Sequence, residues 1–165
     1  MHTKKQISLA LIGEPRVGKT TIVKLLDEDA RSRGTTYQIE TEDISYTIWE
    51  LQTSSIEPQR LEVFATSFLK SSPTFNRFVI IVTDSAIEDV NKIKYSVKFL
   101  RRTFPYTRLA IIANKQDLEE RISKRRIEKM TKLPTLELSA IKQFHRGRLV
   151  DFISYLIDDD SGLEL

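Results

Sequence analysis

The chain has 165 residues, of which 40% are hydrophobic and 30% charged, a balance typical of one soluble globular domain. It contains no cysteine, which excludes disulfides and thiolate metal sites, and no apolar run approaches the ~20 residues of a membrane span. The net charge is only +3, and the basic clusters at residues 101–102 and 124–126 are interpreted as solvated helix faces. We therefore expect one cytoplasmic domain over residues 1–165 and no nucleic acid among its partners.

Short apolar runs alternate with helical patterns along the chain. The polar segment 27–34 ends in glycine, which is typical of a loop, and the two strands that follow it are close enough to predict a hairpin. This alternation predicts an α/β domain whose mostly parallel sheet is covered on both faces, with one antiparallel edge. The predicted strands are residues 7–12, 37–40, 44–49, 78–82, 109–113 and 135–138, and the predicted helices are residues 21–26, 59–69, 87–102, 123–130 and 147–157. The expected core aromatics are Trp49, Phe78, Phe99, Phe104, Phe144 and Phe152.

Residues 13–20 read G-E-P-R-V-G-K-T and fit the phosphate-loop pattern G-x-x-x-x-G-K-[ST] at each fixed position. Gly13 and Gly18 tolerate the backbone torsions that bring N–H groups against phosphate oxygens. Lys19 is suited to the β- and γ-phosphates, and the Thr20 hydroxyl to a Mg²⁺ ion that bridges them. A strand precedes the loop and a helix follows it, which predicts a P-loop NTPase fold. The predicted nucleotide contacts also include Glu14, Pro15, Arg16, Val17 and Thr21.

A second motif, N-K-x-D, directly follows the apolar run 109–113. Ligands of α/β folds bind at the carboxyl ends of parallel strands, where this motif would lie. The Asp117 carboxylate is suited to accept hydrogen bonds from guanine N1 and N2, Lys115 to lie across the base, and Asn114 to tie the loop together. After the next predicted strand, the backbone N–H of Ala140 is suited to the guanine carbonyl oxygen. Leu118, Ser139 and Ile141 complete the predicted base contacts.

With these motifs and their spacings, the chain resembles the Ras superfamily of small GTPases over essentially its whole length. Within it, residues 18–21, 44–49, 82–85 and 114–118 most resemble the Arf branch. The resemblance implies a guanine-nucleotide switch of six strands and five helices, with GTP or GDP and Mg²⁺ as cofactors. It also implies slow GTP hydrolysis and regulatory and effector proteins as partners.

The second switch departs from the family pattern Asp-x-x-Gly-Gln. Glu50 stands in place of the aspartate that holds Mg²⁺ through water, and Thr53 in place of the glycine that contacts the γ-phosphate. Ser54 stands in place of the glutamine that orients the attacking water, so hydrolysis should be slow unless another residue compensates. Gln52 and Gln59 are the nearby candidates for that role.

The resemblance also implies a threonine in the first switch whose hydroxyl coordinates Mg²⁺ when a triphosphate is bound. Thr36 is the favoured candidate and Thr35 the alternative, since both lie in or directly after the loop 27–34. The predicted metal ligands are therefore Thr20, Thr36 and Glu50, and the predicted catalytic residues are Lys19, Thr36 and Gln52.

Two other functions compete with a slow GTPase switch. The substitutions in the second switch favour a hydrolysis-deficient scaffold that binds GTP or GDP without turnover. A nucleotide kinase would share the phosphate loop, but no arginine-rich lid is recognisable and the N-K-x-D motif favours guanine. We expect no signal peptide and no lipid anchor. We also expect a monomer or a weak homodimer that pairs through the strand 37–40.

Overall fold

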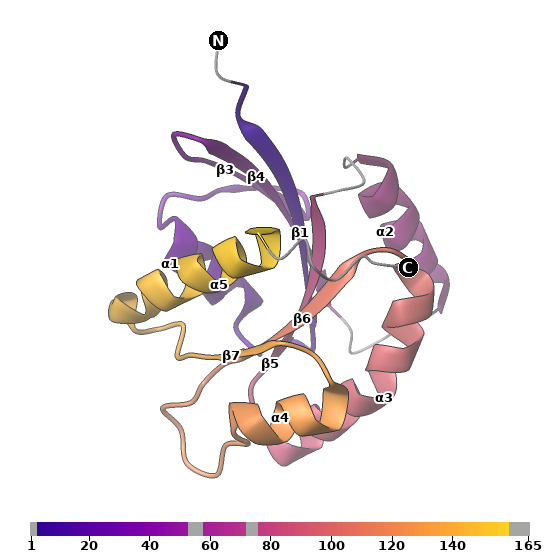
Figure 1. The fold of residues 1–165 in the computed structure, drawn as a ribbon, viewed down its shortest axis with the longest axis vertical. Helices are drawn as coiled ribbons and strands as arrows, with labels where there is room; N and C mark the ends of the chain where they lie inside the picture. Colours follow the sequence, from indigo (N-terminus) through magenta and orange to yellow (C-terminus); the bar gives the residue numbers. More distant parts are fainter. Residues whose placement is uncertain (1–2, 53–57, 72–75, 159–165) are drawn as a thin grey trace.

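The computed structural model describes residues 3–52, 58–71 and 76–158. One sheet, with the strand order β2-β3-β4-β1-β5-β6-β7, runs through the molecule (Figure 1). The strands from β4 to β7 in this order pair in parallel, whereas β3 pairs antiparallel with β4, and β2 with β3. The strand bounds are β1 Lys5–Gly13, β2 Ser32–Arg33, β3 Thr36–Glu40, β4 Ile44–Gln52, β5 Arg77–Thr83, β6 Arg108–Ala113 and β7 Thr135–Glu137.

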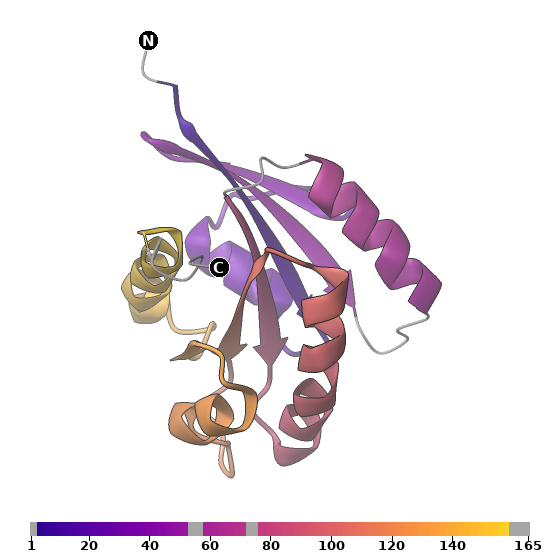
Figure 2. The same ribbon diagram turned by 45° about the vertical axis from the view of Figure 1, so that its right-hand side comes forward.

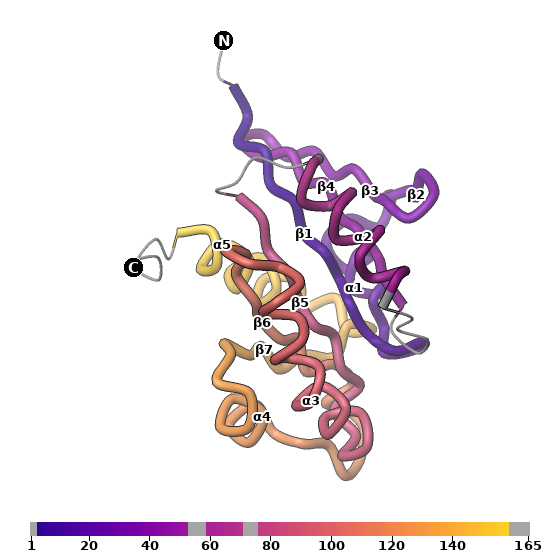
Figure 3. Tube along the Cα trace, turned by 90° about the vertical axis from the view of Figure 1, so that its right-hand side faces the viewer, coloured from indigo at the N-terminus to yellow at the C-terminus, as the bar shows by residue number. Residues whose placement is uncertain are grey.

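The strand β2 corrects the predicted count, because the described residues form seven strands and not six. Its two residues pair with β3 as Ser32 with Tyr37 and Arg33 with Thr36, around a turn in which Gly34 has φ 67°. Both residues of β2 are exposed, so no alternation of apolar and polar side chains marks the strand in the sequence. In the tube view it lies beyond β3 at the outer end of the sheet (Figure 3).

Helices cover both faces of the sheet, as the alternating pattern predicts (Figure 2). One face packs against α1 and α5, and the other against α2, α3 and α4. In β1, Leu9 and Leu11 join the first core and Ala10 and Ile12 the second, so the central strand is buried on both sides. The helix bounds are α1 Lys19–Leu26, α2 Pro58–Ser71, α3 Ile87–Thr103, α4 Lys124–Thr131 and α5 Arg146–Asp158, with a short 3₁₀ turn η1 Gln143–His145 before the last helix. No helix in the described ranges has both the length and the apolar character needed to cross a bilayer.

The aromatic core is only partly the one expected. Phe78 and Phe104 are buried, and Trp49 and Phe152 pack against the two cores. The prediction is wrong for Phe99, which is 39% exposed, and for Phe144, which is 74% exposed. In α3 the inward positions are taken by Val97 and Leu100, which lie three residues apart and leave Phe99 between them on the outer face. Phe144 lies in η1, edge-on to the ring of His145.

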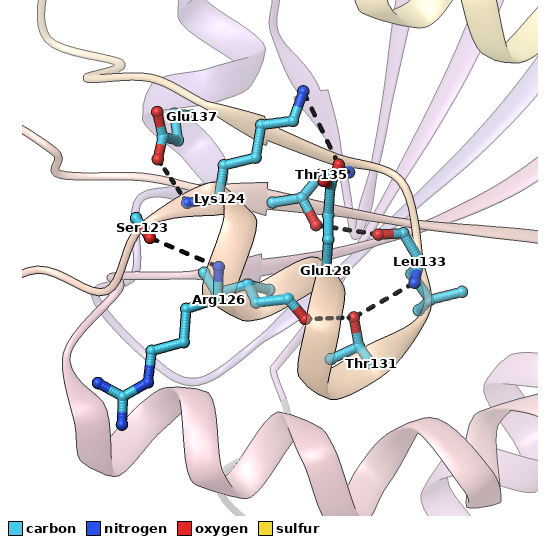
Figure 4. Close-up of polar contacts among 9 residues, drawn as sticks. Ser123, Lys124, Arg126, Glu128, Thr131, Leu133, Thr135 and Glu137 are labelled. Atoms are coloured by element: carbon cyan, nitrogen blue, oxygen red, sulfur yellow. Dashed lines mark hydrogen bonds and ion pairs between the residues drawn. The ribbon is translucent and has the colours of Figure 1, made fainter.

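The short helix α4 has hydrogen-bonded ends (Figure 4). At its start the Ser123 hydroxyl accepts a hydrogen bond from the Arg126 N–H at 3.4 Å, and the Lys124 N–H donates to Glu137 from β7. At its end Thr131 accepts from the Leu133 N–H at 3.3 Å. The first two contacts satisfy N–H groups of the first turn, which have no partner within the helix, and the third holds the chain where it leaves α4.

Ser123→Ala is expected to lower the free energy of unfolding by about 0.5 to 1 kcal/mol, because it removes the N-cap acceptor of α4. Urea unfolding followed by circular dichroism measures this change. Ser96→Ala is the matched control, since the Ser96 hydroxyl only donates to the Lys92 carbonyl within α3 and alanine favours a helix interior. Equal unfolding midpoints for the two variants would show that the Ser123 cap contributes nothing.

Candidate nucleotide-binding site

A cavity of about 880 Å³ opens at the carboxyl end of the parallel strands. Its walls combine the phosphate loop, the first turn of α1, the loop before β3, the end of β4 and the loops after β6 and β7. Most of the predicted site residues therefore meet in one place. The lining residues among them are Pro15, Arg16, Gly18, Lys19, Thr20, Thr21, Glu50, Gln52, Asn114, Lys115, Asp117, Leu118, Ala140 and Ile141.

The two fixed glycines of the phosphate loop are required by close contacts. A Cβ on Gly13 would lie 2.5 Å from the Val82 carbonyl oxygen, so this position packs the loop directly against β5. Gly18 has φ 103°, and a Cβ there would lie 2.2 Å from Asn114 Nδ2. Gly13, Glu14 and Val17 do not line the cavity; Val17 is buried beneath the loop.

Lys19 is held inside the phosphate loop. Its Nζ donates hydrogen bonds to the carbonyl oxygens of Gly13 and Glu14, each at 2.8 Å, and its side chain is buried. Burial lowers the pKa of the ammonium, and the carboxylates of Glu50 and Glu14 oppose that change. The loop therefore presents a positioned cation at the cavity wall, where phosphate oxygens would compete with the two carbonyls.

Asn114 joins the two motifs. Its side-chain amide donates to the Val17 carbonyl at 2.9 Å, and its Oδ1 accepts from the Ala140 N–H at 2.9 Å. The side chain is 3% exposed, so both hydrogen bonds are buried. The Ala140 N–H, which is predicted to meet the base carbonyl, donates to Asn114 in this structure, and its contact with the base stays a prediction. Ala140 itself still lines the cavity.

Asp117 also lines the cavity. Its N–H donates to the Ser139 hydroxyl oxygen at 3.0 Å, and a side-chain hydrogen bond from Ser139 holds the pKa of the Asp117 carboxyl below its usual value. The exposed carboxylate is therefore ionised at neutral pH and is suited to accept hydrogen bonds. Lys115, two residues earlier, has φ 60°, a strained conformation that occurs at binding loops.

Glu50 and Thr20 meet at the predicted metal corner of the cavity. Thr20 Oγ1 donates to Glu50 Oε1 at 2.9 Å, and Tyr37 Oη donates to Glu50 Oε2 at 2.9 Å. The Glu50 N–H donates to the Thr35 carbonyl, also at 2.9 Å. Burial raises the pKa of the Tyr37 hydroxyl, and the hydrogen bond to Glu50 raises it further. The hydroxyl therefore keeps its proton and remains a donor. A carboxylate and a hydroxyl are oxygen ligands that suit Mg²⁺.

The comparisons with known proteins agree with this geometry. The model of the ADP-ribosylation factor family, Arf, matches residues 1–150. The chain belongs to the Arf family.

Two solved structures show the same fold as this Arf-family chain. The Arl6 BBS3 small GTPase from Trypanosoma brucei, solved with the nucleotide analogue GppNp, superposes with a TM-score of 0.67 at 13% identity, covering 93% of this chain and 98% of the other. The FeoB G-domain from Methanococcus jannaschii superposes with a TM-score of 0.60 at 19% identity, covering 94% and 99%. The comparison with curated proteins gives no match.

The two candidate threonines for the metal site of this Arf-family chain, Thr35 and Thr36, occupy different places. Thr35 lines the cavity, whereas Thr36 lies in β3 outside the lining, where its hydroxyl donates to the Arg33 carbonyl at 3.1 Å. The favoured candidate, Thr36, is therefore turned to a backbone partner, and the geometry favours the alternative, Thr35. The choice of the metal-binding threonine stays a prediction.

The second switch is only partly described. Gln52 lines the cavity, whereas Gln59 is exposed in α2 and does not. Thr53 and Ser54 lie outside the described residues. Among the described residues, no cluster of three or more His, Cys, Asp or Glu side chains could hold a metal ion without the nucleotide. The pair Thr20 and Glu50 fits a metal that the phosphates also coordinate.

Sequence reasoning did not assign Tyr37, Arg60 or His145 to the site. Tyr37 supports Glu50 from the neighbouring strand, and Arg60 from α2 lines the cavity. His145 Nδ1 accepts a hydrogen bond from the Ser139 N–H at 2.8 Å. Burial lowers the pKa of the His145 imidazole, and the nearby cations Arg148 and Lys142 lower it further. The strict alternation of buried and exposed residues in β3 marks Tyr37 as inward, but only the strand pairing gives its partner.

Proposed function

We propose that this Arf-family protein is a guanine-nucleotide switch that binds GTP and GDP with Mg²⁺ and hydrolyses GTP slowly. The observation that carries the proposal is Asn114, whose buried side chain joins the phosphate loop to the loops that flank Asp117. These hydrogen bonds support a phosphate site and a guanine site in one cavity. Membership of the Arf family supports the same activity.

The proposed contacts form two groups, one at the phosphates and one at the guanine base. Lys19 and the N–H groups of the phosphate loop would bind the β- and γ-phosphates and stabilise the charge that develops between them. Asp117 would accept hydrogen bonds from guanine N1 and N2, and Lys115 would lie across the ring. Thr20 and Glu50 would hold Mg²⁺, with Thr35 in preference to Thr36 as the third protein ligand. The bound Mg²⁺ would neutralise phosphate charge.

Hydrolysis needs a water in line with the bond that breaks. The water oxygen bonds to the γ-phosphorus as the bond to the β–γ bridging oxygen breaks, which gives GDP and inorganic phosphate. Gln52, the last residue of β4, lines the cavity. We propose that it positions the water in place of the family's glutamine. Gln52 precedes by two residues Ser54, which stands in place of the family's glutamine, so we expect it to position water less well and the rate to be low.

Gln52→Ala is expected to slow GTP hydrolysis, and Gln59→Ala is the matched control, because it removes an exposed glutamine that does not line the cavity. The measurement is phosphate release under single-turnover conditions with Mg²⁺, beside binding of GTP, GDP and ATP. We expect guanine-specific binding and a wild-type rate on the order of 10⁻⁴ per second or lower. A fall of about tenfold for the first variant alone would support water positioning by Gln52.

The same experiment distinguishes a slow GTPase from the competing function, a scaffold that binds GTP or GDP without hydrolysis. The substitutions Thr53 and Ser54 favour a hydrolysis-deficient scaffold. Tight binding of GTP and GDP with no phosphate release would identify the scaffold and exclude a role for Gln52. Failure to bind any guanine nucleotide would overturn the switch and the scaffold together.

We further infer a single G domain over residues 1–165 that works in the cytoplasm with regulatory and effector proteins. A switch needs partners that recognise one nucleotide state, and Thr35 lines the cavity in the first switch region, directly before β3. The chain would act as a monomer or as a weak dimer that pairs through β3. In β3 only Thr36 and Tyr37 pair with β2, which leaves the edge of Gln38–Glu40 for such pairing.

A further inference from the structure

Tyr37 and Thr20 both support the carboxylate of Glu50. Each carboxylate oxygen of Glu50 has its own donor, with Tyr37 on Oε2 and Thr20 on Oε1, both at 2.9 Å. Glutamate is one methylene longer than aspartate, so it can reach Thr20 from β4 while its other oxygen remains beside β3. The two oxygens therefore point to different partners.

The position of the Tyr37 hydroxyl is fixed by packing. The side chain is 8% exposed and belongs to the core beneath α1 and α5. Its residue pairs with Ile48 in the antiparallel ladder between β3 and β4, two residues before Glu50. The Glu50 N–H is bonded to the Thr35 carbonyl, which holds the backbone of the same corner. Tyr37 thus holds one oxygen of a half-buried carboxylate from a rigid strand.

A cation bound to Thr20 would replace the hydrogen bond between Thr20 and Oε1, whereas the hydrogen bond from Tyr37 would still occupy Oε2. The arrangement therefore leaves Glu50 one oxygen for a cation. Mg²⁺ requires near-ideal octahedral coordination at about 2.0–2.1 Å and takes one oxygen from each carboxylate in such sites, whereas Ca²⁺ accepts six to eight ligands and bidentate carboxylates. A carboxylate whose second oxygen is bound by a phenol suits the first ion better than the second.

We propose that Tyr37 is a positioning residue that restricts Glu50 to coordination through one oxygen and so makes the nucleotide-bound cation site selective for Mg²⁺ over Ca²⁺. The proposal rests on the proposed function, because the cation is the one that GDP or GTP brings to Thr20 and Glu50. It adds a specificity-determining role for a residue that touches neither nucleotide nor metal.

The test measures dissociation of a fluorescent GDP analogue from the full chain. The rate is recorded in chelator alone and then in titrations with Mg²⁺ or Ca²⁺ alone, and the selectivity is the ratio of the two half-maximal concentrations. For Tyr37→Phe we expect a fall in Mg²⁺ selectivity of at least fivefold, with the rate in chelator changed less than twofold. An unchanged selectivity would overturn the proposal.

Tyr46→Phe is the matched control. Tyr46 lies in β4 opposite Ile39 of β3 and is half-buried, and its hydroxyl donates to no acceptor among the described residues. It should keep the wild-type selectivity. An equal loss of selectivity in both variants would assign the effect to general loosening of the hairpin and would overturn the role of Tyr37.

A second variant tests whether Tyr37 acts through Glu50. Glu50→Asp shortens the side chain, so it cannot reach both Thr20 and Tyr37, and it should also lower the selectivity. Adding Tyr37→Phe to Glu50→Asp should then change the selectivity less than twofold, whereas independent effects would multiply and overturn the proposal. If GDP binds to the wild type and neither cation slows its release, the metal-dependent part of the proposed function fails and this inference fails with it. If only the Tyr37 variant behaves like the wild type, the inference fails alone.

Discussion

Asp117→Asn is expected to weaken GTP binding by about 100-fold or more and to favour xanthosine triphosphate. The carboxylate would accept hydrogen bonds from guanine N1 and N2, and a hydrogen bond to a charged group contributes about 1.5–3 kcal/mol. Asparagine presents an N–H where an acceptor is needed, so the contact to the guanine amino group becomes repulsive. Xanthine carries an oxygen at that position, which the new amide can bond.

Competition of GTP and xanthosine triphosphate for a fluorescent guanine nucleotide measures both changes. Asp151→Asn is the matched control, because Asp151 is exposed in α5 and does not line the cavity. The pKa of Asp117 is already held low by Ser139, so the wild-type preference for guanine should be constant from neutral pH down to the weakly acidic range. Equal GTP affinity in wild type and Asp117→Asn would show that the base is read elsewhere.

The local structure of each motif was predictable from the sequence. The phosphate loop follows a strand and begins a helix, and the residues of N-K-x-D follow β6, so each motif brings its own backbone geometry. The apolar runs also gave the parallel strands, because strands buried on both faces have continuous hydrophobic sequences. These patterns predict contacts between residues that are close in the sequence. The structure adds that the two motifs line one cavity.

Contacts between distant residues were not predictable in the same way. Tyr37 and Glu50 are 13 residues apart, and their meeting depends on the register of β3 against β4. A shift of that register by one residue would turn Tyr37 to the other face of the sheet. The Thr36 hydroxyl donates to the Arg33 carbonyl across the β2–β3 turn, which no sequence pattern predicts, so the sequence favoured a threonine that does not line the cavity. The two-residue strand β2 is too short and too polar to carry a pattern.

Lys19→Ala is expected to abolish triphosphate binding, with a loss of affinity of at least about 1,000-fold, which corresponds to about 4 kcal/mol. Its ammonium is the buried cation of the phosphate loop, and two loop carbonyls already orient it toward the cavity. Alanine would remove that charge and leave the carbonyl oxygens of Gly13 and Glu14 without the donor that they have in the wild type. The variant therefore loses the attraction to the phosphates, and its loop loses two hydrogen bonds.

Lys24→Ala separates this effect from loss of the fold. Lys24 lies on the same helix, is exposed, and also donates to loop carbonyls, those of Glu28 and Ala30, at the end of α1 away from the cavity. Titration calorimetry with GTP and Mg²⁺, together with thermal unfolding by circular dichroism, compares the two variants. Lys24→Ala should bind like the wild type, and Lys19→Ala should unfold cooperatively yet bind no GTP. Nanomolar binding in a folded Lys19→Ala would remove the phosphate-loop assignment, because no other buried cation among the described residues lines the cavity to replace it.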